Sequence, residues 1–160
     1  MDFLVEPIKV PPETNIIFGM SHFIKTVEDL YEVMVNNVPN AKFGIAFNEA
    51  SGPRLVRYDG NNQRLIDIAK ENQKRIGAGH TFLIVLEDAF PINILPAVKR
   101  CVEVVNIFCA TANPVKVVIA KEGDSIGVMG VMDGASPKGI EFNSEIAQRK
   151  KLLRDFGYKR

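Results

Sequence analysis

Histidine is the residue type in this chain best suited to act as a nucleophile or a general base near neutral pH. The chain has two, His22 and His80. His80 follows Gly77-Ala78-Gly79 and begins an apolar run, so two glycines leave space there for a ligand to approach. His22 follows an apolar run and precedes a helix start, with Lys25 nearby to attract an anion. Either histidine could instead serve only the structure, through a hydrogen bond to the backbone.

A loop at residues 133–139 has the composition of a phosphate-binding segment. Glycines free its backbone, a serine hydroxyl can donate a hydrogen bond, and a lysine supplies a point charge suited to phosphate. Flexible surface loops often have the same composition, so an ordinary loop is the alternative. The candidate ligand residues in this loop are Asp133, Gly134, Ser136, Lys138 and Gly139.

Further polar residues follow apolar runs elsewhere in the chain. Thr111 and Asn113 could bond a base or a sugar, or merely stabilise a turn. Phe90 could stack on a planar base, although an aromatic residue there is often part of a core. Asp88 and Asn93 flank that ring and complete the set of candidate ligand residues. A fourth polar turn runs from residue 48 to residue 54.

Familiar nucleotide and metal motifs are missing from the sequence. It has no G-x-x-x-x-G-K-[ST] loop, and Gly77-Ala78-Gly79 precedes a strand rather than linking a strand to a helix. It also lacks an H-E-x-x-H motif or paired cysteines, so the sequence predicts no metal ligands. A conventional ATP-dependent kinase is therefore not indicated by these motifs.

Strands and helices must alternate to position these groups. Apolar runs and alternation predict strands at residues 3–10, 15–20, 42–47, 55–58, 80–87, 104–110, 115–120 and 126–132. Helices are predicted from Thr26 to about residue 37, from about residue 62 to 76, and at 91–101 and 144–156. This order predicts an α/β fold, a mixed β-sheet flanked by helices in an α/β/α-like layered sandwich. With no linker or repeat, residues 1–160 are expected to form a single domain.

Composition excludes several other classes of protein. The net charge is only +1, and the basic cluster at 149–151 with Arg154 is interpreted as a solvated helix face, so neither nucleic acid nor a membrane surface is an expected partner. The longest apolar run, residues 82–86, is far shorter than a membrane span. With no secretory signal, Cys101 and Cys109 are expected to stay reduced in the cytoplasm.

Five blocks spread over nearly the whole chain carry a resemblance to a known family. They are SHFIKTVEDLYE at 21–32, GHTF at 79–82, FPIN at 90–93, FCATANP at 108–114, and DG with PKG within 133–139. Together they resemble the adenosine-specific kinase family of archaea and some bacteria. The resemblance implies an α/β homo-oligomer that binds adenosine or AMP, with a histidine that holds a phosphoryl group. It does not choose between His22 and His80, of which the flanking glycines favour His80.

Three hypotheses follow. In the first, the protein is a phosphotransferase that acts on adenosine through a phosphohistidine, with ATP or another phosphate donor and magnesium. Lys25 or Lys138 would then neutralise phosphate charge, and Asp88 or Asp133 would orient the imidazole or accept a hydroxyl proton. In the second, the protein is a non-catalytic adenosine or AMP sensor. In the third, it is a structural or assembly protein, and the polar strand ends only terminate the sheet.

Overall fold

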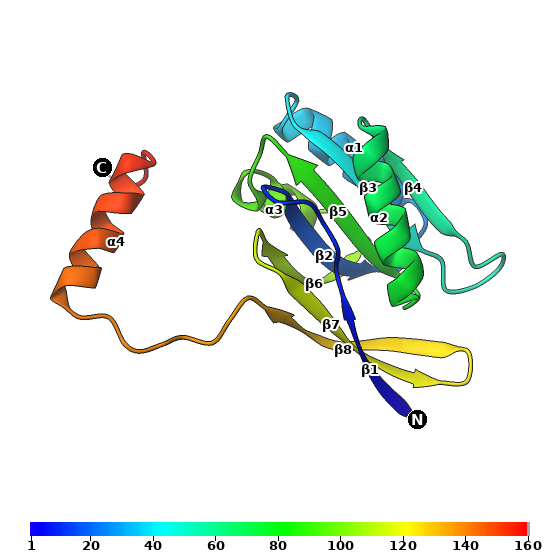
Figure 1. The fold of residues 1–160 in the computed structure, drawn as a ribbon. Coiled ribbons are helices and arrows are strands. Elements are labelled where there is room, and N and C mark those ends of the chain that lie inside the picture. The colour runs from blue at the N-terminus through cyan, green and yellow to red at the C-terminus, as the bar shows by residue number, and fades with distance from the viewer. Residues whose placement is uncertain (160) are drawn as a thin grey trace.

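The computed structural model describes residues 1–159, and its elements are shown in Figure 1. The strands are β1 (Asp2–Pro7), β2 (Asn15–Ser21), β3 (Lys42–Asn48), β4 (Val56–Gly60), β5 (Thr81–Glu87), β6 (Val104–Thr111), β7 (Val115–Glu122) and β8 (Ser125–Asp133). The helices are α1 (Thr26–Asn37), α2 (Gln63–Ile76), α3 (Pro91–Lys99) and α4 (Asn143–Asp155). None of these helices is long and apolar enough to cross a bilayer.

The strands of the described residues are divided between two sheets. One sheet has the order β4-β3-β5-β2-β6, and the other has the order β1-β7-β8. Every pair of neighbouring strands in them is antiparallel. The α/β class with helices layered on a sheet is confirmed, and the structure adds the strand neighbours that spacing alone had left open.

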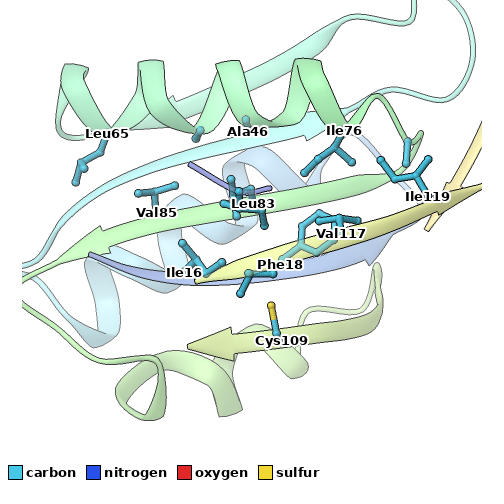
Figure 2. Close-up of a cluster of buried hydrophobic side chains, with 14 residues drawn as sticks. Ile16, Phe18, Ala46, Leu65, Ile76, Leu83, Val85, Cys109, Val117 and Ile119 are labelled. Atoms are coloured by element: carbon cyan, nitrogen blue, oxygen red, sulfur yellow. The ribbon is translucent and has the colours of Figure 1, made fainter. Parts of the chain in front are cut away.

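β5 lies at the centre of the larger sheet, with both faces covered as its long apolar run predicts. Successive side chains of a strand point to opposite faces. Phe82, Ile84 and Leu86 therefore pack under α1 and α3. Leu83 and Val85 lie on the other face, beneath α2 and beside Val117 and Ile119 of β7 (Figure 2). Burial of each such side chain stabilises the fold by about 1.5–3 kcal/mol.

α2 is fixed at both of its ends and lies very close to β3. The Asn62 side chain accepts a hydrogen bond from the Leu65 amide at 3.1 Å, which satisfies one free N–H of the first turn. Gly77 ends the helix in the left-handed conformation with φ of 67°, as the sequence predicts. A Cβ on Gly44 of β3 would overlap the backbone of α2 at Leu65, so only glycine allows this approach.

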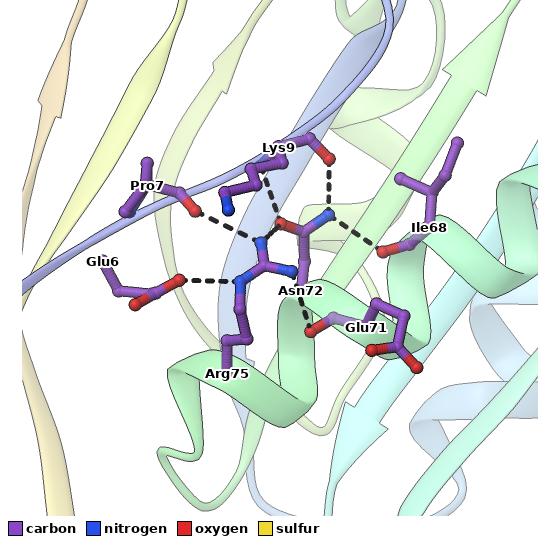
Figure 3. A network of polar contacts seen from close by, with 7 residues as sticks. All are labelled: Glu6, Pro7, Lys9, Ile68, Glu71, Asn72 and Arg75. Atoms are coloured by element: carbon purple, nitrogen blue, oxygen red, sulfur yellow. Dashed lines mark hydrogen bonds and ion pairs between the residues drawn. The ribbon is translucent and has the colours of Figure 1, made fainter.

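Asn72 of α2 holds the segment that follows β1 (Figure 3). Its side chain accepts from the Lys9 amide at 2.7 Å and donates to the Lys9 carbonyl at 2.8 Å. Arg75, one turn later, donates to Glu6 at 2.7 Å. The predicted strand at 3–10 is therefore too long: β1 ends at Pro7, because residue 9 bonds to a helix side chain instead of a strand.

The helix predicted at 144–156 forms as α4, but it does not pack on the rest of its own chain. Figure 1 shows it standing apart at the end of an extended segment. None of its residues is buried. α3 ends at Lys99, two residues before the predicted end, because a turn at Arg100 and Cys101 leads into β6.

Candidate functional site

A cavity of about 720 Å³ lies at the end of the larger sheet where β5 begins. Three parts of the chain enclose it: the β3–β4 loop, the C-terminal end of α2, and the turn between β7 and β8. The lining residues that carry polar or charged side chains are Asn48, Glu49, Arg54, Gln73, Lys74, His80, Asp124 and Ser125. His80 is the only one of them among the candidate catalytic residues of the sequence.

The backbone of His80 is held by two neighbouring strands. Its amide donates to the Asn48 carbonyl at 2.7 Å, and its carbonyl accepts from the Ser21 amide at 2.9 Å. These bonds keep His80 in the left-handed conformation with φ of 64°, which side chains other than glycine rarely adopt. The imidazole stacks on the Phe47 ring, with 6.1 Å between centroids. His80 is thus one of the residues that line the cavity, and its ring lies against Phe47.

The glycines before His80 have a packing role in addition to the one expected from the sequence. A Cβ on Gly79 would lie 2.8 Å from the Ala50 Cβ, so the missing side chain lets the β3–β4 loop approach. A Cβ on Gly77 would lie 3.2 Å from Ile126 of β8. Both glycines also line the cavity, so a ligand there can approach their backbone.

Asn48 is a buried side chain of the cavity lining with an unsatisfied oxygen. Its Nδ2 donates to the carbonyls of Gln73 at 3.0 Å and Ala78 at 3.1 Å. These bonds leave Oδ1 buried and without a donor among residues 1–159. Buried polar atoms normally find a partner. A ligand hydroxyl, an amino group or a water molecule could satisfy this oxygen.

Two cations line the cavity and are available to an anion. Lys74 forms no ion pair within the described part of the chain, and Arg54 lies 4.0 Å from the exposed Asp124. Glu49 is differently placed. The Leu55 amide and Arg57 hydrogen-bond its carboxylate at 2.8 and 2.9 Å, and both lower the pKa of Glu49. Glu49 therefore stays ionised, with its charge directed to Arg57.

His22 lies at the same end of the sheet but outside this cavity. Its amide donates to the Glu103 carbonyl at 3.1 Å, and its side chain is exposed. Lys25 forms an ion pair with Asp29, one turn along α1, and the hydrogen bond to Asp29 raises the pKa of Lys25. The structure thus places Lys25 with a protein carboxylate as its partner.

Glu103 and Asp29 form a carboxyl pair that no pattern in the sequence indicates. Glu103 is only 1% exposed, and neither of its oxygens accepts a bond from an N–H or hydroxyl donor in residues 1–159. Burial, with the adjacent Asp29, raises the pKa of Glu103. Burial acts in the same direction on Asp29, but hydrogen bonds from Lys25 and Glu103 outweigh it and lower the Asp29 pKa. Glu103 therefore holds its proton to a higher pH than an ordinary glutamate does.

The other candidate residues lie at the opposite end of β5, roughly 25 Å from His80 by strand length. Asp88 and Phe90 line a second cavity of about 720 Å³ together with Glu13 and Asn15. Asn93 accepts a hydrogen bond from the Phe90 amide at 2.9 Å and so serves as a helix cap. Asp88 cannot reach the His80 imidazole within one chain.

Thr111, Asn113 and Asp133 form a small hydrogen-bonded cluster at that same far end. The Asp133 carboxylate accepts from Thr111 at 2.9 Å and from Asn113 at 3.1 Å. Gly134 follows with φ of 67°, and its amide donates to the Pro114 carbonyl at 3.0 Å. Asp133 therefore does not orient the His80 ring of its own chain. Ser136, Lys138 and Gly139 follow this cluster in the chain, are exposed, and are not among the residues that line either cavity.

Of the candidates named from the sequence, His80 lines this cavity, and the structure adds Asn48, Lys74 and Ser125 to the lining. Asn48 and Arg54 belong to a polar turn that was visible in the sequence. Lys74 gave no separate signal, because it reads as one more charge on the solvent face of α2. Within residues 1–159 no three His, Cys, Asp or Glu side chains come together as a metal site.

Comparison with known proteins identifies the family. The model of a family described as adenosine specific kinase matches residues 6–159. A crystal structure of the PH1918 protein from Pyrococcus horikoshii OT3 is similar, with 39% sequence identity and a TM-score of 0.95. The similarity covers 99% of this chain and 98% of that one. No curated protein matches. Since the family model spans nearly the whole described fold, including the His80 cavity, this chain belongs to the adenosine-specific kinase family.

Proposed function

We propose that this protein transfers a phosphoryl group to adenosine through His80, in the cytoplasm. The observation that carries the proposal is that His80, with its backbone held by two strands, lines a cavity together with Arg54 and Lys74. An imidazole nitrogen is a competent nucleophile toward phosphorus. Two cations nearby would stabilise the negative charge of the phosphoryl group as it transfers.

The transfer has two steps. In the first, an imidazole nitrogen of His80 attacks the phosphorus of a donor, the new P–N bond forms, and the P–O bond to the donor breaks. In the second, a hydroxyl oxygen of adenosine attacks the same phosphorus, the P–N bond breaks, and the hydroxyl proton leaves to solvent. AMP is the product. ATP, accompanied by magnesium, is the proposed donor.

His80 is a better candidate than His22 for the phosphoryl carrier. His22 is exposed outside the cavity, and the nearest cation in its sequence, Lys25, is paired with Asp29. The unsatisfied Asn48 oxygen near His80 would accept a hydrogen bond from a nucleoside hydroxyl or amino group. Specific binding of adenosine over guanosine would then depend on which donors reach this oxygen.

Isotope transfer with matched histidine variants tests the proposal. The protein would be incubated with ATP labelled in the γ-phosphate and magnesium, and the label followed on protein and on AMP. We expect His80→Asn to lose both signals by at least about a hundredfold, the usual scale for removal of a catalytic nucleophile or base. His22→Asn, the matched control, should keep both. Loss of the label in His22→Asn with retention in His80→Asn would overturn the assignment.

A second candidate function is the binding of adenosine or AMP without turnover. One observation favours it. The carboxylate of Glu49, which lines the cavity, accepts hydrogen bonds from Arg57 and from the Leu55 amide. The other carboxylate of the lining, Asp124, lies 4.0 Å from Arg54, so each of the two carboxylates has a cation beside it. If this function is correct, His80→Asn should retain the rise in melting temperature that adenosine causes in the wild type, and no labelled AMP should form with either protein.

A further inference from the structure

The C-terminal arm, residues 134–159, lacks a partner in its own chain. Nine residues, 134–142, link β8 to α4, and extended chain of that length reaches roughly 30 Å. Figure 1 shows α4 well separated from the body, residues 1–133. Of the arm residues, only Ile146 and Leu153 are even partly covered. Contacts within this chain therefore do not hold α4 in place.

One face of α4 is apolar, and no other part of its own chain buries it. Phe142, Ile146, Leu153 and Phe156 recur at helical spacing and form a stripe on one side of the helix. Phe142 is 76% and Phe156 69% exposed. A helix of 13 residues is marginal in water without tertiary packing. A stable α4 thus implies a surface that buries this stripe.

The direction in which the arm leaves the body is fixed. The side chains of Thr111 and Asn113 both donate to the Asp133 carboxylate, at 2.9 and 3.1 Å. The amide of Gly134 donates to the Pro114 carbonyl at 3.0 Å, and its φ of 67° turns the chain away from β8. Hydrogen bonds within the body therefore set the direction in which the arm leaves it.

The crystal structure from Pyrococcus horikoshii has its arm in the same place. A TM-score is averaged over chain length, so superposition of the body alone, 133 of 160 residues, could reach only about 0.83. The observed score is 0.95. The arm must therefore superpose as well, which means that the same extended conformation occurs in a protein only 39% identical.

Charge identifies the kind of surface that receives the arm. Residues 134–160 contain seven basic and three acidic residues, whereas residues 1–133 contain thirteen basic and sixteen acidic ones. The arm thus carries a formal charge of +4 and the body −3. The body also exposes apolar side chains around α3 and the start of β6, at Phe90, Ile92, Val102 and Val105. The body of a second copy therefore offers the two properties that the arm requires, a negative charge and exposed apolar side chains.

We propose that α4 of one copy packs its apolar stripe on the body of a second copy, so that the chain forms an arm-exchanged homo-oligomer. Burial of a stripe of large apolar side chains supplies the stability that α4 lacks alone. The opposite charges of arm and body favour the encounter. Ser136 and Lys138, which line neither of the two cavities of their own chain, would then lie against the partner.

Sedimentation velocity of two matched full-length variants tests the role of the stripe. Leu153→Asp adds one negative charge within the stripe, and Ala147→Asp adds the same charge on the opposite side of α4. We expect the wild type and Ala147→Asp to sediment as multiples of 17.8 kDa. Leu153→Asp should dissociate toward the monomer, with a dissociation constant at least about tenfold higher. A monomeric wild type, or equal behaviour of the two variants, would overturn the proposal.

Cross-linking of mixed copies tests the exchange itself, independently of any variant. Unlabelled and ¹⁵N-labelled proteins would be unfolded together, refolded, and treated with a carbodiimide, which joins lysine amines to carboxylates. If the arm lies on a second copy, cross-links from Lys150 or Lys151 to carboxylates of residues 1–133 will join light to heavy peptides in about half of cases, the random-mixing value. Arm-to-body cross-links found only within light or within heavy chains would show that the arm folds back, contrary to the proposal.

Discussion

His80 illustrates how a residue can be held for chemistry by its backbone. Hydrogen bonds from two strands fix it in a left-handed conformation, and the imidazole stacks on the Phe47 ring. A conformation of this kind costs on the order of 1 kcal/mol in a side chain other than glycine. The sheet therefore stabilises a placement that the residue itself does not favour.

The Glu103–Asp29 pair makes stability depend on pH. Because the folded state raises the pKa of Glu103 above its ordinary value of 4.5, folding favours the protonated carboxyl. This contribution is fully present below pH 4.5 and is lost as the pH rises through the raised pKa. Asp29, whose pKa is lowered, acts in the opposite sense: its contribution is present above its ordinary value and is lost in acid.

Glu103→Gln should therefore stabilise the fold at alkaline pH. The amide cannot ionise but can still donate a hydrogen bond to Asp29, so the buried negative charge is removed while the contact is kept. We expect a gain of about 1 kcal/mol at pH 8 that shrinks toward pH 4, measured by urea unfolding across that range. The exposed Glu32→Gln on α1 is the control and should show no such trend. The assignment would be contradicted if the stability gain of Glu103→Gln over the wild type were smaller at pH 8 than at pH 4.

At the scale of elements, the contact between α2 and β3 depends on a missing side chain. Gly44 lies directly beneath Leu65 and Ile66, and α2 in turn ends at the loop that carries His80. The opposite end of the same helix contributes Gln73 and Lys74 to the lining of the cavity.

Gly44→Ala should destabilise the protein by about 1–3 kcal/mol, the usual cost of forcing extra volume into a packed site. Gly127→Ala in β8 is a matched control, because a Cβ there meets nothing within 4 Å. Thermal unfolding of both variants would measure the difference. Equal stability of the two variants would mean that α2 can shift freely away from β3.

The elements that sequence predicts best here are those with local signals. The apolar run of β5 predicted a central strand, and Gly77 predicted the end of α2, because both features depend on neighbouring residues. Strand neighbours were not predictable in this way, since β2 pairs with β5 and β6, which lie far along the chain. The separation of α4 from the body also gave no signal, because an apolar stripe looks the same whichever surface covers it.

At the scale of the whole molecule, the candidate residues fall at two ends of one sheet. His22, Lys25 and His80 lie at one end, while Asp88 and Phe90 lie at the other. The sequence alone predicts one shared site for them, because each follows or precedes a strand. In an antiparallel sheet, however, the ends of successive strands alternate between the two edges. Knowledge of strand direction was therefore needed to separate them.

The two ends of the sheet carry cavities of about equal volume, and the proposed function depends on which of them binds the nucleoside. The cavity at His80 has Arg54 and Lys74 for a phosphate group. The cavity at Asp88 has Phe90 for a base, but Glu13, Glu87 and Asp88 would repel a phosphate there.

A crystal structure of the wild-type protein with AMP would test the central claim most directly. We expect AMP in the His80 cavity, with its phosphate within ion-pair distance of Arg54 or Lys74 and within reach of the imidazole. A donor group of the nucleoside should lie close to the Asn48 oxygen. AMP bound instead in the cavity at Asp88 and Phe90, with the His80 cavity holding only water, would contradict the account.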